Sequence, residues 1–179
     1  MKLLRVRASN FKNCCDNFTI DLIAKSKKTS EDKEYELQMI ADELYVFNTA
    51  AFVGRNASGK TTAIELLECG YTILGEFSLE NKHYSYENVT LELIFYHDGD
   101  IYKYTTVLKA DSSLGNRANF TEQHLYKKKY YKTKLKEIYA DAGFDEIIGL
   151  GELPEDTSIV FFVLKKKATR AVYFDCDGK

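Results

Sequence analysis

The sequence lacks any apolar run of about 18 residues, the length that a helix needs to cross a membrane. It also lacks a positively charged start followed by an apolar stretch, which is the pattern of a secretion leader. We therefore predict a cytoplasmic protein with no membrane partner.

The cysteines and histidines also lack the sequence spacing that is typical of metal sites. The cysteines are Cys14, Cys15, Cys69 and Cys176. They form no C-x-x-C pair, and no histidine lies at a spacing that would complete a zinc site. The three histidines are scattered and make no nucleophile constellation. Free thiols are the expectation, and zinc or disulfide chemistry is not.

A large charge excess is absent too, because the net charge is only -2. Such a balance gives no overall electrostatic footprint for nucleic acid. Lysines are interleaved with tyrosines from Tyr126 to Lys132, but exposed strands favour the same residues, so nucleic-acid contact there is the lesser alternative. With 45% hydrophobic residues, the chain of 179 residues predicts one domain around one sizeable core.

One motif carries chemistry. Its residues are Gly54, Arg55, Asn56, Ala57, Ser58, Gly59, Lys60, Thr61 and Thr62. They fit the phosphate-binding pattern G-x-x-x-x-G-K-[ST], in which a glycine-rich turn brings backbone N–H groups close to a triphosphate. Lys60 would reach the β and γ phosphates, and the Thr61 hydroxyl would hold Mg²⁺.

The context of the motif favours the same interpretation. Asn48 to Val53 has the composition of a buried strand, and a helix is predicted from Lys60 with Gly75 at its C-terminal cap. The predicted apolar face of this helix contains Ala63, Leu66, Leu67, Gly70, Tyr71 and Leu74.

Most of the remaining pattern predicts antiparallel strands. Residues 1–10 and 18–22 alternate and predict a hairpin, followed by a solvated loop from Lys25 to Glu36. Further strands are expected at 89–96 and 101–110, joined by an Asp98-Gly99 turn, and at 118–131.

A short amphipathic helix is expected next. Over 132–142, Leu135, Ile138, Tyr139 and Ala142 share one face, and Gly143 would end the helix. The stretch from 144 to 157, which contains the single proline Pro154, is expected to be irregular.

The N-F-K turn at residues 10–12, the short F-T-I-D-L strand and the G-R-N-A-S-G-K-T loop together resemble the start of the ABC-type, AAA-like P-loop ATPase heads of the SMC, RecF and phage-defence ATPase group. Asn56 distinguishes this version of the loop from that of kinases and small GTPases. Ala57 replaces the commoner glycine, which is expected to be tolerated if its φ is negative.

The resemblance implies an α/β P-loop NTPase fold, namely an ABC-ATPase-like head lobe with an inserted antiparallel β-subdomain at 89–131. It implies that Lys12 lies near the nucleotide phosphates, and that Lys60 is the catalytic lysine. It also implies an ATPase that binds ATP and Mg²⁺ and closes as a homodimer of intact heads, with DNA or a defence effector as a partner.

The sequence offers only one weak candidate for the catalytic acid that such an ATPase needs. Asp175 follows four apolar residues and is the best candidate for a second magnesium contact, but Cys176 stands where a glutamate would be expected. The chain is therefore expected to be the N-terminal lobe of a longer ATPase and inactive alone. Two alternatives stay open: a complete small P-loop NTPase or kinase that uses Asp175, and a non-hydrolysing, nucleotide-dependent interaction module.

Overall fold

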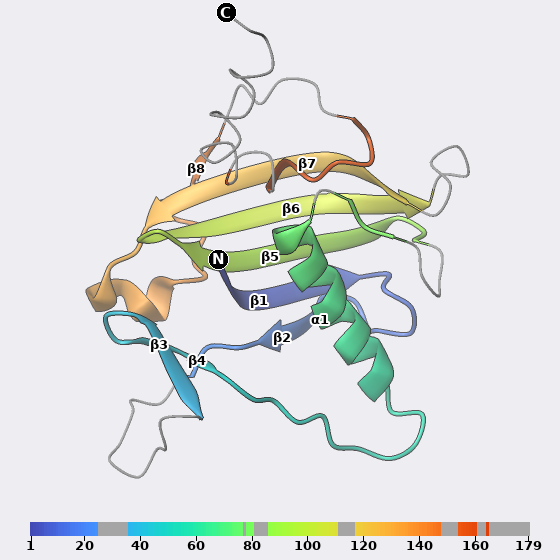
Figure 1. Ribbon diagram of the computed structural model, residues 1–179, viewed down its shortest axis with the longest axis horizontal. Coiled ribbons are helices and arrows are strands. Elements are labelled where there is room, and N and C mark those ends of the chain that lie inside the picture. Colours follow the sequence, from blue (N-terminus) through green and yellow to red (C-terminus); the bar gives the residue numbers. More distant parts are fainter. Residues whose placement is uncertain are drawn as a thin grey trace, which may run out of the picture.

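The fold is built around one antiparallel sheet of six strands in the order β2-β1-β5-β6-β7-β8 (Figure 1). The computed structural model describes residues 1–24, 36–76, 78–80, 86–110, 117–147, 154–160 and 164. Of these residues, 44% lie in strands and 19% in helix. The main sheet contains β1 (Lys2–Ser9), β2 (Phe18–Asp21), β5 (Val89–His97), β6 (Asp100–Ala110), β7 (Ala118–Lys129) and β8 (Asp145–Glu146).

The predicted fold class is wrong. An α/β P-loop NTPase needs parallel strands joined by crossover helices. Every strand pair in the described residues is antiparallel, and α1 (Lys60–Gly75) is the only long helix among them. The strands of the expected inserted subdomain, β5 to β7, instead continue the same sheet as β1 and β2.

The predicted strand before the glycine loop is wrong for the same reason. Residues 48–53 form no strand, and the Val53 side chain is 93% exposed. An apolar segment becomes a buried strand only when neighbouring strands pair with its edges and other layers cover its faces. The described part of the chain provides no such neighbours for this segment.

The antiparallel strands, by contrast, are confirmed. β1 pairs with β2 from Arg5–Asp21 to Ala8–Phe18, as the hairpin pattern predicts. β5 and β6 pair along their whole length, and His97 lies opposite Asp100. The two residues between them, Asp98 and Gly99, have φ of 51° and 83°, the left-handed conformation that a tight two-residue hairpin turn requires.

The helix α1 packs across one face of this sheet (Figure 1). The helix predicted from Lys60 is confirmed, but its buried face is rotated from the predicted one. Tyr71 is exposed and Leu67 is only half-buried. The buried residues are Ala63, Leu66, Cys69, Gly70, Ile73 and Leu74. They meet Leu3, Val6 and Leu93 of the sheet in the larger hydrophobic cluster.

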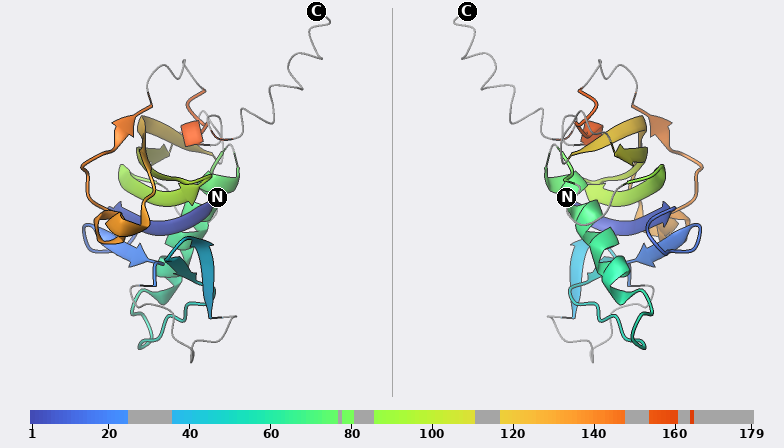
Figure 2. Two further views of the ribbon diagram at one scale, coloured as in Figure 1. Left: turned by 90° about the vertical axis from the view of Figure 1, so that its left-hand side faces the viewer. Right: turned by 90° about the vertical axis from the view of Figure 1, so that its right-hand side faces the viewer.

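The opposite face carries a smaller cluster beneath a second hairpin, β3 (Leu37–Ala41) and β4 (Leu44–Phe47). A bulge at Leu4 in β1 turns that side chain away from Val6 and Ala8 and into this cluster. The regular alternation predicted for residues 1–10 would place Leu4 on the same face as Val6 and Ala8, so it fails at Leu4. Figure 2 shows α1 and the segment after β7 on opposite sides of the sheet.

The predicted helix at 132–142 is a short 3₁₀ helix, η2 (Lys132–Glu137). Lys134 has non-helical backbone angles, so a continuous α-helix does not form. Ile138 is nevertheless buried in the smaller cluster, with Leu135 and Tyr139 packed against it.

Tyr139 ties this segment to the sheet. Its ring lies under the Arg5 guanidinium, 3.9 Å from the ring centroid, and its hydroxyl donates to Asp21 Oδ1 at 2.6 Å. Burial, together with the nearby Asp21 carboxylate, raises the pKa of Tyr139. The phenol therefore stays protonated and keeps donating this hydrogen bond.

Candidate functional site

The glycine loop leads directly into α1. The Ser58 N–H donates to the Arg55 carbonyl at 3.3 Å, and Ala57 and Gly59 both have left-handed φ, 62° and 85°. The condition given for tolerating Ala57, a negative φ, is therefore not met. A left-handed conformation costs a residue with a Cβ about 1–2 kcal/mol, so the loop holds alanine in an unfavourable conformation.

Position 54 favours glycine because the Ser58 side chain lies close to it. A Cβ on Gly54 would lie 2.6 Å from Ser58 Oγ, so a side chain there would force the serine hydroxyl to rotate. The loop therefore folds back on itself most easily with glycine at its first position.

Lys60 folds back across the loop. Its Nζ donates to the carbonyl oxygens of Gly54 at 2.9 Å and Arg55 at 2.7 Å. The ammonium group is thus held against the loop backbone, at a position that solvent still reaches. A cation in this position is placed to meet an anionic group that enters the loop.

The first turn of α1 adds a partial positive charge. Gly59 is the N-cap and supplies no side-chain hydrogen bond, and the turn contains no acidic residue. The first backbone N–H groups of a helix have no intrahelical acceptor, and the helix dipole makes this end attractive to anions. Thr61 lies exposed at this end, with Thr62 half-buried beside it.

A cleft of about 800 Å³ opens beside the loop. Three segments line it: residues 13–15 with Phe18 from the turn between β1 and β2, residues 51–53, and residues 57–63. This volume lies within the range of small-ligand sites, about 300–1,000 Å³. Burial and the neighbouring Cys15 raise the pKa of Cys14, so that wall of the cleft carries a neutral thiol.

Lys12 lies in the turn between β1 and β2, where Phe11 is fully buried and Lys12 has φ of 51°. Its ammonium forms an ion pair with Glu65 on α1. Lys12 does not line the cleft, so its placement near a phosphate stays a prediction. Glu65 was not predicted as a site residue, and only its i,i+4 spacing from Thr61 could have indicated it.

The described residues show no cluster of metal-ligating side chains at Thr61. Nowhere in that part of the chain do three or more His, Cys, Asp or Glu side chains gather as a metal site would require. Asp175 lies outside the described residues, as does the predicted solvated loop at 25–35. The metal roles of Thr61 and Asp175 therefore stay predictions.

A second cavity, of about 670 Å³, is lined by the lysines considered above as a lesser nucleic-acid surface. Lys127 and Lys129 pair with the buried Asp100 carboxylate at 2.8 and 3.4 Å. Lys128 Nζ donates to the carbonyls of Glu137 and Ala140. These cations serve internal partners, which disfavours a nucleic-acid surface here.

Within the described residues, no helix combines the length and apolarity that membrane crossing requires. Comparison of the chain with protein-family models, with curated proteins and with solved structures finds no match.

Proposed function

We propose that the chain binds the phosphates of Mg-ATP in the loop Gly54–Thr62 and contributes this part of the site to an ATP-hydrolysing assembly. The observation that carries the proposal is the position of the Lys60 ammonium, which two loop carbonyls hold against the loop backbone. Beside it are the first turn of α1 and an open cleft.

These features suit a phosphate chain better than a neutral ligand. Lysine, unpaired helix N–H groups and a hydroxyl are donors, and this first turn of α1 offers no carboxylate that would repel an anion. The ligand would replace the two carbonyl contacts of Lys60 with charge-assisted contacts to phosphate oxygens. Thr61 would contribute its hydroxyl to the shell of Mg²⁺.

Hydrolysis is assigned to an assembly rather than to this chain alone. Phosphoryl transfer needs charge neutralisation on several sides of the γ phosphate and a group that orients the attacking water. The cleft borders the exposed residues Ala51 and Val53, and covering Val53 with another protein segment would also enclose the cleft. A homodimer, or a further catalytic segment, would provide this cover.

The test is a titration of the purified chain with a fluorescent ATP analogue, with and without Mg²⁺. Lys60→Ala is expected to weaken binding by about tenfold or more, because a charge-assisted contact is worth more than about 1.4 kcal/mol. Lys136→Ala is the matched control, since it removes an exposed lysine on η2, away from the loop. Equal affinity of wild type and Lys60→Ala would contradict the phosphate role of the loop.

Turnover tests the second half of the proposal. The isolated chain is expected to release phosphate from ATP at a rate close to background. Rapid hydrolysis by the isolated chain, abolished by Lys60→Ala, would show that no additional segment is needed.

A further inference from the structure

The hairpin formed by β3 and β4 is apolar on both faces. Leu44 and Val46 point into the smaller hydrophobic cluster. Directly opposed residues of an antiparallel pair share a face, and the pairs Leu37–Phe47 and Met39–Tyr45 form the other face, which we name the outer hairpin face. On this face Met39 is 62% exposed and Phe47 is 47% exposed, whereas Tyr45 is half-buried and Leu37 is buried.

β3 also has an open edge. β4 is bonded on both sides, to β3 and to the chain after β2, where Ala24 N–H donates to the Tyr45 carbonyl and Phe47 N–H to the Leu22 carbonyl. Among the described residues, no strand pairs with the far side of β3. The register shift at Ile40 confines the straight part of the edge to its first residues, up to Met39.

Before the bulge, this edge has no charged residue or proline to protect it. Exposed edge strands normally carry lysine, proline or another charged residue that prevents pairing with a further strand. β3 reads L-Q-M-I-A and contains neither charge nor proline. An uncharged edge beside an exposed apolar face is the arrangement that strand addition uses, with main-chain hydrogen bonds along the edge and side-chain contacts beside it.

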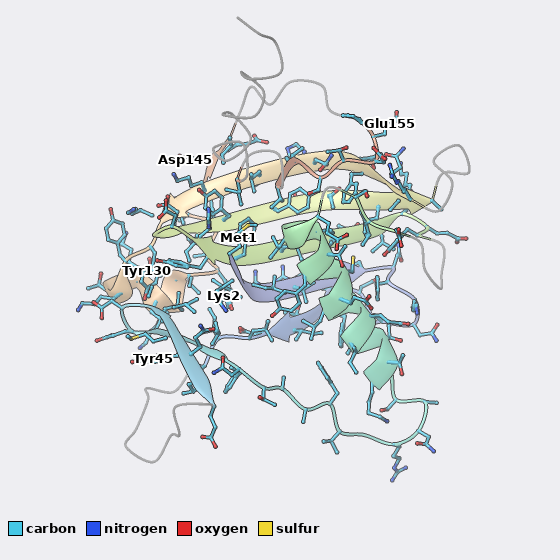
Figure 3. The ribbon with its side chains drawn as sticks, viewed as in Figure 1. Met1, Lys2, Tyr45, Tyr130, Asp145 and Glu155 are labelled. Atoms are coloured by element: carbon cyan, nitrogen blue, oxygen red, sulfur yellow. The ribbon has the colours of Figure 1, made fainter. Side chains whose placement is uncertain are left out.

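The acidic residues on either side of β3 indicate what kind of partner this edge would bind. Glu36 precedes β3, and Asp42 and Glu43 form the turn that follows it. Asp42 forms an ion pair with Lys132 at 2.9 Å, and this hydrogen bond, with the charges of Asp42 and Glu43, raises the pKa of Lys132. Two carboxylates beside one lysine leave the turn negative. Burial, and then the same two carboxylates, raise the pKa of Tyr130, which is labelled in Figure 3. Its hydroxyl donates to the Asp42 carbonyl at 2.6 Å.

A second copy of this chain fits the edge poorly. Antiparallel pairing of two β3 strands would place Glu36 opposite Asp42 of the other copy, and parallel pairing would align identical acids. Like charges directly opposite each other destabilise strand pairs. A strand flanked by basic residues has the complementary charge.

We propose that the free edge of β3, together with the outer hairpin face, binds an extended segment of a partner protein in which apolar residues alternate and lysine or arginine stands at the ends. The segment adds as a strand to β3. Its apolar side chains cover Met39 and Phe47, and its basic ends meet Glu36 and the Asp42–Glu43 turn. This interaction is independent of the nucleotide.

The test uses the full chain and a synthetic peptide in which Val and Thr alternate between lysine pairs at each end. We expect saturable binding by fluorescence anisotropy, loss of binding when proline replaces the central residue of the peptide, and weaker binding when glutamate replaces the lysines. Equal binding of the lysine and glutamate peptides, or no binding of either, would overturn the proposal.

Two test variants and one control variant locate the binding site on the protein. Met39→Lys is expected to weaken binding by about tenfold, because it removes an apolar contact and repels the basic peptide. Ile64→Lys is its matched control: Ile64 is an exposed residue of α1, and its substitution should leave affinity unchanged. Glu43→Gln is expected to weaken binding by about two- to fivefold and to reduce its salt dependence.

Sedimentation of the chain without peptide tests whether a second copy of the chain binds the β3 edge instead. A monomer is expected at working concentrations. A dimer that Met39→Lys dissociates would assign the edge to a second copy and overturn the proposal.

Discussion

At the residue scale, Ala57 shows a conflict between loop geometry and side chain. Its φ of 62° suits glycine, and its methyl group makes that conformation unfavourable. The alanine identity was readable from the sequence, but its backbone angle was not, because the angle follows from the turn that brings Gly54 and Ser58 together.

Replacing this alanine with glycine is therefore expected to stabilise the loop. Ala57→Gly should raise the free energy of unfolding by about 0.5–1 kcal/mol, measured by urea denaturation. Ala50→Gly is the control: Ala50 has no positive φ, so glycine there should lower stability through the greater entropy of the unfolded chain. A loss of stability in Ala57→Gly as large as that in Ala50→Gly would argue against left-handed strain at this residue.

At the scale of the element, the contact between α1 and the sheet depends on a residue without a side chain. A Cβ on Gly70 would lie 3.3 Å from Leu93 Cδ2 and 3.5 Å from Leu3 Cδ2. The helix pattern did place Gly70 on the buried face, but the closeness of the sheet became apparent only from the packing.

Gly70→Val is expected to destabilise the protein by about 1–3 kcal/mol, because added carbon atoms would push α1 away from the sheet. Gly75→Ala, at the last position of the same helix, meets nothing within 4 Å and should be neutral or stabilising by up to about 1 kcal/mol. Thermal unfolding followed by circular dichroism measures both. If the two variants melt alike, the close approach at Gly70 does not limit packing.

At the scale of the whole molecule, one sheet separates two hydrophobic clusters. Neighbouring residues of β5 serve opposite faces: Leu93 belongs to the larger cluster beneath α1 and Ile94 to the smaller one beneath the hairpin. Both side chains are fully buried. Because the clusters share the same strands, neither can lose its packing without disturbing the other.

Leu93→Ala and Ile94→Ala are each expected to cost about 2–5 kcal/mol and to lower the midpoint of one common unfolding transition. Near-ultraviolet and far-ultraviolet circular dichroism should give coincident curves for both variants. Two separated transitions in Ile94→Ala would indicate that the hairpin side unfolds independently of the sheet.

Local patterns alone determined several parts of this protein. Alternating residues predicted β1, β2 and β5 to β7, Asp98-Gly99 predicted a tight turn, and the glycine loop with Lys60 predicted the start of α1. These features depend on backbone preference and on contacts between residues close in sequence, or joined by one short turn.

Tertiary structure decided the rest. The apolar composition of residues 48–53 suits a buried strand, yet such a strand requires partner strands, and none among the described residues pairs with this segment. The bulge at Leu4, the ion pair of Lys12 with Glu65 and the open edge of β3 likewise depend on which distant segments meet. Periodicity shows which face of an element is apolar, but only packing determines what covers that face.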